Sequence, residues 1–256
     1  MFVEVDGLRV NLERAGTGPP LLLLHGWGGS SRSFAPLMPA LVSDFSICAP
    51  DLPGFGLSAP PPSTWGISDY ASFTLHLLDR INWPRAHLLG HSHGGRVSIA
   101  VAAQTPAVVD RLVLVDSAGI RPPRTLALRT RGLIARTARR VLGHALTGAT
   151  GRRILGATYR RLGMSDYASA GELRATFVRI VNEDLSGLLP RIAARTLVVW
   201  GAKDIETPLW MGLQMARDIP NAKLVVLPGA GHYSYLEAPQ RFEQQVREFL
   251  TAERKE

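Results

Sequence analysis

Short apolar runs alternate along this chain with segments whose apolar residues recur at helical spacing. The run "PLLLLHG" is continuously apolar, which is typical of a strand buried on both faces of a sheet. Similar runs are "HLLG", "LVLVDS", "TLVVWG" and "KLVVLPG", and helical patterns accompany them near residues 68–81, 94–104, 208–218 and 239–251. Because strands joined by crossover helices pair in parallel, the sequence predicts an α/β fold with a mostly parallel central sheet and helices on both faces.

The N-terminal region adds further elements to this prediction. Alternating apolar and polar residues indicate strands near residues 2–5 and 8–14, and another strand is expected at 45–49. Helical spacing around residues 33–42 predicts a helix between the run "PLLLLHG" and the strand at 45–49. A loop rich in proline and glycine, "DLPGFGLSAPPPS", follows.

Residues 121–180 interrupt the alternation with an arginine-rich stretch. They hold 13 arginines, no lysine and two acids, a local balance of +11 in a chain whose net charge is +8. Leucines and alanines recur at roughly helical spacing in "RTLALRTRGLIARTARRVLGHAL". We therefore predict a helical cap inserted at residues 120–180 between two halves of one core, 1–119 and 181–256.

The composition limits the expected location of the protein and the ligands it is expected to bind. The apolar run Leu21–Leu24 is far too short to cross a bilayer, so we expect no transmembrane segment and a cytoplasmic protein. The single cysteine, Cys48, excludes an internal disulfide and a multi-cysteine metal site, and no pattern calls for a metal or cofactor. The arginines suggest nucleic acid, but residues 121–180 contain few aromatic side chains for base stacking, so no nucleic-acid partner is expected. The oligomeric state stays open.

The segment "HLLGHSHGG" joins a predicted strand to a predicted helix through Ser92. Gly90 and Gly94 stand two residues before and after the serine. A strand that turns into a helix within one residue strains the backbone and leaves no room for side chains at these positions. The turn would lift the serine hydroxyl clear of the sheet at the positive end of the helix, where an oxyanion is favoured.

Three more patterns accompany this turn in a fixed order. "LLLLHGWGG" precedes it, "VVWGAKDIETP" follows, and "VVLPGAGHYSYLE" comes last. With "DLPGFGLS" between them, the chain resembles the α/β-hydrolase superfamily along nearly its whole length. The resemblance implies that Ser92 is a nucleophile, His232 its general base and Asp204 the acid that orients the base. It also implies an oxyanion hole made by the backbone N–H groups of Trp27 and His93.

Asp116, in "LVLVDSAG", is a rival to Asp204, because some members of the superfamily carry their acid after that strand. The G-x-x-D-x-x-x-P form around Asp204 favours the later residue. We expect structural roles for Asp51 and Ser58 in the loop they flank.

The other histidines near these patterns are expected to pack rather than to transfer protons. The side chain of His91 should point away into the fold. His93 should contribute its backbone N–H to the oxyanion hole rather than its ring to proton transfer. His25 should brace the oxyanion loop, and it is also a candidate, with Tyr233, for lining the substrate pocket.

The serine nucleophile disfavours the dehalogenase and epoxide-hydrolase branches, which use aspartate. We therefore predict hydrolysis of small or medium carboxylic esters, with a cap whose arginines would attract anionic substrates. Hydrolysis of C–C bonds in ring-fission products, lactonase and perhydrolase activity remain open because they use the same groups, although C–C hydrolases usually carry tryptophan where Tyr233 stands. A ligand receptor on the same fold is the non-enzymatic alternative.

Overall fold

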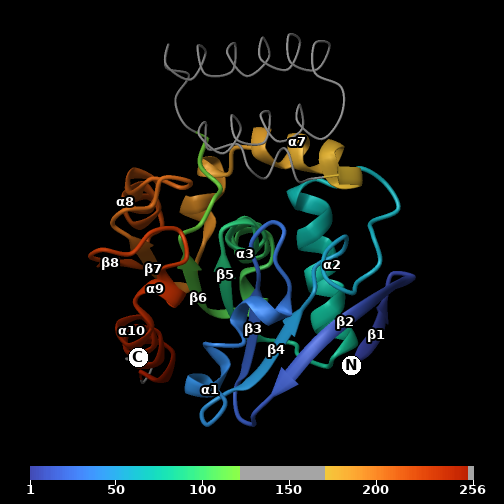
Figure 1. Cartoon of the computed structure of the whole chain (residues 1–256), viewed down its shortest axis with the longest axis horizontal. Helices are drawn as coiled ribbons and strands as arrows, with labels where there is room; N and C mark the ends of the chain where they lie inside the picture. The colour runs from blue at the N-terminus through green and yellow to red at the C-terminus, as the bar shows by residue number, and fades with distance from the viewer. Residues whose placement is uncertain (122–170, 253–256) are drawn as a thin grey trace, which may run out of the picture.

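The computed structural model describes residues 1–121 and 171–252, which form one eight-stranded sheet with helices on both faces (Figure 1). The spatial order of the strands is β1-β2-β4-β3-β5-β6-β7-β8. The strands are β1 (Phe2–Val5), β2 (Leu8–Ala15), β3 (Pro20–Leu24), β4 (Ser46–Pro50), β5 (Ala86–His91), β6 (Val109–Val115), β7 (Arg195–Gly201) and β8 (Ala222–Leu227). β1 pairs antiparallel with β2, and β2 pairs antiparallel with β4, whereas all pairs from β4 to β8 are parallel. The predicted α/β class is confirmed.

The central strand β3 shows why its sequence is apolar at every position. Leu22 and Leu24 belong to one hydrophobic cluster, whereas Leu21 and Leu23 belong to a second cluster. Successive strand side chains point to opposite faces, so a strand covered on both sides has no position for a polar residue. The first cluster lies under the helices at residues 67–80, 93–104 and 209–218, and the second lies under the helices at residues 38–41 and 239–251.

Outside the predicted cap, four of the five predicted helices form within one residue of their predicted ranges: α2 (Ile67–Arg80), α3 (His93–Gln104), α8 (Leu209–Asp218) and α10 (Pro239–Thr251). The short helix α9 (Ser234–Glu237) lies where no helix was predicted. The single helix expected at residues 33–42 is instead a 3-10 turn, η1 (Ser31–Phe34), followed by a short helix, α1 (Met38–Leu41). Pro36 and Pro39 explain the break, because a proline inside a helix removes a hydrogen bond and clashes with the preceding turn.

The predicted cap falls largely on residues 122–170, which lie outside the described residues. Its described end is the 3-10 turn η3 (Gly171–Leu173) and the helix α7 (Arg174–Asn182), which lies across the carboxyl ends of the strands (Figure 1). The Trp65 amide donates to Thr176 Oγ1, and the buried Arg96 guanidinium donates to the carbonyl of Ile180. These bonds fasten α7 to the core. The 3-10 turn η4 (Ser186–Arg191) then leads into β7.

Among the described helices, none combines the length and the apolar character that crossing a membrane requires.

Candidate active site

Ser92 lies in a strained turn between β5 and α3, with φ 51° and ψ −109°. The two flanking glycines explain how the chain tolerates this turn. A Cβ atom on Gly94 would lie 1.9 Å from the carbonyl oxygen of Leu24, and one on Gly90 would lie 2.4 Å from the carbonyl oxygen of Gly94. Only glycine fits at either position, as the sequence pattern predicts.

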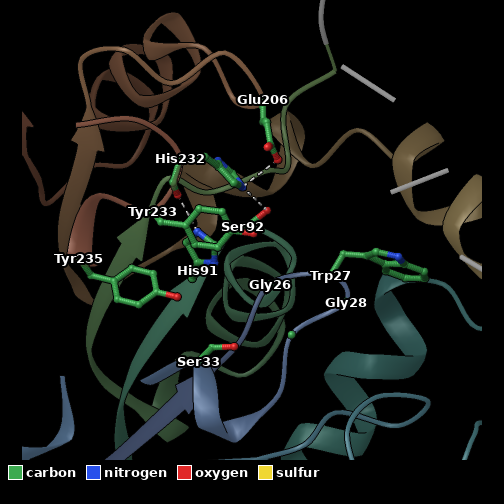
Figure 2. Close-up of a pocket in the computed structure, with 11 residues that line it drawn as sticks. Gly26, Trp27, Gly28, Ser33, His91, Ser92, Glu206, His232, Tyr233 and Tyr235 are labelled. Atoms are coloured by element: carbon green, nitrogen blue, oxygen red, sulfur yellow. Dashed lines mark hydrogen bonds and ion pairs between the residues drawn. The ribbon is translucent and has the colours of Figure 1, made fainter. Parts of the chain in front are cut away.

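The structure brings Ser92, His232 and Asp204 into one line of hydrogen bonds. The Ser92 Oγ lies 3.1 Å from His232 Nε2 (Figure 2), and His232 Nδ1 lies 2.8 Å from Asp204 Oδ2. A carboxylate only accepts, so Nδ1 carries the proton and Nε2 is left to accept the serine hydroxyl. These residues come from β5–α3, the loop after β8 and the loop after β7, and only the folded sheet places them together.

Asp204 is held ionised beside this imidazole. The Thr207 hydroxyl donates to its Oδ2 at 2.6 Å, and the amides of Glu206 and Thr207 donate to its Oδ1 at 2.8 and 3.0 Å. Burial tends to raise the pKa of Asp204, but the hydrogen bonds from His232 and Thr207 outweigh it and leave the pKa below its ordinary value. Burial likewise tends to lower the pKa of His232, and the neighbouring Asp204 raises it above its ordinary value.

Asp116, the rival acid, faces other partners. Its Oδ1 accepts the Gly201 amide at 2.7 Å, and its Oδ2 accepts the Ser234 amide at 3.1 Å. Burial raises the pKa of Asp116 to about 7. This side chain therefore ties the end of β7 to the start of α9, while Asp204 is the carboxylate that meets His232.

The oxyanion hole expected from the backbone N–H groups of Trp27 and His93 stays a prediction, which the local backbone supports in two ways. His93 is the first residue of α3, so its N–H is one of the donors that a helix leaves without an internal acceptor. Trp27 lies in the loop after β3, which the Gly29 amide closes by donating to the Gly26 carbonyl at 3.1 Å. Within the described residues, no backbone carbonyl accepts from either of the two N–H groups.

His25 does not line the pocket, in contrast to one of its two predicted roles. Its Nδ1 donates to the Gly26 carbonyl at 2.8 Å, and its Nε2 accepts the Leu52 amide at 2.9 Å. The ring is fully buried, and burial lowers its pKa to about 4. The neutral ring therefore braces the oxyanion loop against the loop after β4, as its other predicted role requires.

The loop after β4 is tied down by Asp51. Its carboxylate accepts the amides of Ser31 at 2.7 Å and Leu57 at 2.8 Å. The Ser58 hydroxyl donates to the Asp51 carbonyl at 2.6 Å. Both side chains have the structural contacts expected of them.

The histidines on either side of Ser92 point in different directions. His91 was expected to point away into the fold, but its ring lies beneath His232 and on the wall of the pocket (Figure 2). His91 is the last residue of β5. Its Nε2 contacts the backbone carbonyl of His232, and only folding brings that distant part of the chain close to it. The His93 ring is buried against Trp27 and Tyr70, at ring-centroid distances of 5.5 and 5.0 Å.

A cavity of about 260 Å³ opens beside Ser92. Its walls are the loop Gly26–Gly29 and the side chains of Ser33, His91, Glu206, His232, Tyr233 and Tyr235 (Figure 2). Tyr233 thus lies where the sequence predicted a pocket residue.

Sequence reasoning did not predict Ser33, Tyr235 or Glu206 as cavity residues, and of these three Glu206 approaches the base. Its Oε2 lies 3.5 Å from His232 Nε2, on the same nitrogen that Ser92 contacts, and its side chain is 42% exposed. The available signal was its place in "DIETP", two residues after Asp204 in the same turn. In the part of the chain that the structure describes, no three His, Cys, Asp or Glu side chains gather as metal ligands.

Comparisons with known proteins agree with this arrangement. Residues 21–245 match the model of the alpha/beta hydrolase family. A 2-hydroxymuconate semialdehyde hydrolase of Pseudomonas sp. (strain CF600) is 30% identical over 267 residues, covering 95% of this chain and 91% of that protein. The enol-lactonase from Burkholderia xenovorans LB400 superimposes with a TM-score of 0.77 at 25% identity, over 98% of this chain and 100% of that one. A thermophilic esterase from Thermogutta terrifontis gives a TM-score of 0.76 at 26% identity, over 98% of both chains.

Proposed function

The chain belongs to the alpha/beta hydrolase family, and from this premise we propose that it cleaves small or medium carboxylic esters through an acyl-enzyme on Ser92. The observation that carries the proposal is the continuous line from Ser92 Oγ through His232 to Asp204, at 3.1 and 2.8 Å. The first distance is within the range for proton transfer from the serine hydroxyl to the imidazole, and the second lets the carboxylate orient that imidazole.

In the first half of the reaction, Ser92 Oγ attacks the ester carbonyl while its proton passes to His232 Nε2. The negative charge on the carbonyl oxygen is stabilised by the N–H groups of Trp27 and His93. The bond from the carbonyl carbon to the alkoxy oxygen then breaks, and the departing oxygen takes the proton from Nε2. An acyl group stays on Ser92, and the alcohol leaves.

In the second half, water replaces the alcohol. His232 Nε2 takes a proton from the water as its oxygen attacks the acyl carbon, and returns that proton to Ser92 Oγ as the acid departs. Asp204 stays ionised throughout, since its pKa is held low, and it stabilises the imidazolium in both halves.

Hydrolysis of a C–C bond is the second candidate. The similarity to a 2-hydroxymuconate semialdehyde hydrolase and to an enol-lactonase favours it, because the same serine, base and amides serve these substrates. The similarity to an esterase favours the first candidate. Tyr233, where C–C hydrolases usually carry tryptophan, also supports the ester.

A substrate panel tests the proposal. Purified protein is assayed with p-nitrophenyl esters of increasing acyl length and, separately, with a meta-ring-fission product. We expect turnover and a burst of p-nitrophenol from the short and medium esters, with the burst equal to the enzyme concentration. Efficient cleavage of the ring-fission product without ester turnover would replace the proposal with the second candidate, and binding without any burst would leave a receptor.

A further inference from the structure

We propose that Thr207 is a positioning residue, whose hydroxyl and amide together hold the carboxylate of Asp204 in the orientation that meets His232. This inference rests on the proposed ester hydrolysis and adds a fourth residue to the same site. Thr207 stands immediately before Pro208 in the G-x-x-D-x-x-x-P form, at one of the positions that this form leaves unspecified.

The Thr207 hydroxyl lies where three loops of the active site meet. The strands β6, β7 and β8 are neighbours in the sheet, and the loops after them carry Asp116, Asp204 and His232. Thr207 Oγ1 lies 2.6 Å from Asp204 Oδ2, 3.0 Å from the Asp116 carbonyl oxygen and 3.2 Å from His232 Nδ1. One oxygen atom therefore contacts all three loops, directly beside the hydrogen bond between the base and its acid.

The direction of these hydrogen bonds follows from the proton on His232. A hydroxyl has one hydrogen to donate and two lone pairs, and the shortest contact identifies Asp204 Oδ2 as its acceptor. His232 Nδ1 carries its own proton, so it donates rather than accepts. This N–H faces both Asp204 Oδ2, at 2.8 Å, and the Thr207 oxygen, at 3.2 Å. Both acceptors favour the tautomer that leaves Nε2 free for Ser92.

Thr207 binds both oxygens of the Asp204 carboxylate. Its amide donates to Oδ1 at 3.0 Å, and its hydroxyl donates to Oδ2 at 2.6 Å. The Glu206 amide is a second donor to Oδ1, and His232 is the second donor to Oδ2. Together these four donors occupy the roughly four lone-pair positions of a carboxylate. A rotation of the carboxylate would break both bonds from Thr207 at once, so this one residue fixes the direction in which Oδ2 points.

Thr207 is itself held in place by the core. Its carbonyl accepts the indole N–H of Trp200, a fully buried residue of β7, at 2.7 Å. Pro208 restricts the backbone of the residue before it, and a β-branched side chain has few allowed rotamers. The threonine is buried, with 6% of its surface exposed. The hydroxyl is therefore oriented before any substrate binds.

These contacts predict an effect on turnover rather than on substrate binding. Thr207 acts on His232 through Asp204, and it is not among the described residues that line the cavity beside Ser92. Without the hydroxyl, the carboxylate could turn and the imidazole would lose part of its support. Misplacing a catalytic group by about 1 Å can lower the rate by about 10²-fold.

Thr207→Val tests the proposal, because valine keeps the shape of threonine and removes the hydroxyl. We expect kcat for p-nitrophenyl butyrate to fall by about 10²-fold, with little change in KM. Thr207→Ser restores the hydroxyl and should recover most of this loss. Thr196→Val is the matched control, since Thr196 is a buried threonine at the other end of β7 whose hydroxyl donates to the Ala194 carbonyl at 2.9 Å. It should keep the wild-type kcat.

A double variant shows whether Thr207 acts through Asp204. Asp204→Asn alone should lower kcat by roughly 10⁴-fold. Residues that act as a unit have non-additive effects, so adding Thr207→Val to Asp204→Asn should lower the rate little further. The rates are measured with enzyme in excess over the ester, after subtracting the rate of Ser92→Ala. Thermal unfolding of each variant checks that it is folded.

Three results would overturn the inference. The first is a wild-type kcat in folded Thr207→Val, and the second is the same fold-loss from Thr207→Val with and without Asp204→Asn. If Thr207→Val does not fold, Thr207→Ser and Thr207→Ala give the comparison, because they differ only in the hydroxyl, and equal kcat values in this pair are the third. Absence of any Ser92-dependent hydrolysis of p-nitrophenyl esters by the wild type would instead overturn the proposed function, and with it the role of Thr207.

Discussion

His91 donates a hydrogen bond from its Nε2 to the backbone carbonyl of His232 at 2.8 Å, and the two rings lie 4.9 Å apart. The residue before the nucleophile thus holds the loop that carries the base. Burial lowers the pKa of His91 to about 3, with repulsion from His232 as a second cause. His91 therefore stays neutral when His232 becomes protonated, so it adds no second positive charge beside the base.

Replacing His91 by phenylalanine should lower kcat without moving the pH profile. The ring volume is retained, but the anchor of the His232 loop is lost, and small misplacements of a base cost roughly 10²-fold. The measurement is kcat/KM for p-nitrophenyl butyrate against pH, with thermal unfolding as the check on folding. A loss of about 10⁴-fold in a folded variant would point to a direct role of His91 in proton transfer.

Ser92→Ala should abolish hydrolysis and leave the fold intact. Removing a triad nucleophile costs on the order of 10⁴-fold or more in kcat, and alanine fits the space of serine. Turnover of p-nitrophenyl esters and the acyl-enzyme burst are both measured. Near-normal activity in well-folded protein would contradict the nucleophile assignment.

Replacing the two aspartates should have different effects, on turnover for Asp204 and on stability for Asp116. Asp204→Asn would leave His232 in the wrong tautomer and cut kcat by roughly 10⁴-fold. Asp116→Asn must turn an amide group toward either Gly201 N–H or Ser234 N–H, and a buried unpaired donor costs about 1–3 kcal/mol of folding free energy. Parallel kcat and Tm measurements decide. The reverse pattern would make Asp116 the acid.

Activity should rise with pH as His232 loses its proton. Burial lowers the pKa of His232, but the hydrogen bond and charge of Asp204, with a smaller contribution from Glu206, raise it above the ordinary value. The acid limb of kcat/KM should therefore lie above the usual histidine range and move to lower pH in Glu206→Gln. Unchanged limbs in this variant would mean that Glu206 does not act on the base. Glu4→Gln is the control, because it removes the same charge from an exposed position on β1 at the edge of the sheet.

Gly94→Ala should destabilise the protein strongly. The added methyl would lie 1.9 Å from the Leu24 carbonyl oxygen, which belongs to the central strand and cannot move aside. We expect a loss of about 3 kcal/mol or more in the free energy of unfolding, measured with urea. Gly187→Ala is the control, because nothing lies within 4 Å of its added carbon.

The sequence by itself determined the fold class, the family and the turn that carries Ser92. Each of these depends on local patterns. The double-sided burial of β3 requires apolar residues, here Leu21–Leu24, and the tight turn at Ser92 requires Gly90 and Gly94. These residues can therefore be recognised without knowing what surrounds them. Pro36 and Pro39 also indicate the break in the helix expected at residues 33–42, but the helical spacing of the apolar residues favoured one continuous helix.

Only the tertiary structure decided which side chains meet. Asp116 and Asp204 both follow parallel strands that end at the same edge of the sheet; the G-x-x-D-x-x-x-P form favoured Asp204, but only the fold brings that carboxylate to His232. The directions of His91 and His25, and the approach of Glu206 to His232, depend on loops that are far apart along the chain. The physical reason is that side-chain contacts across loops are set by the relative placement of strands, which arises only when the sheet assembles.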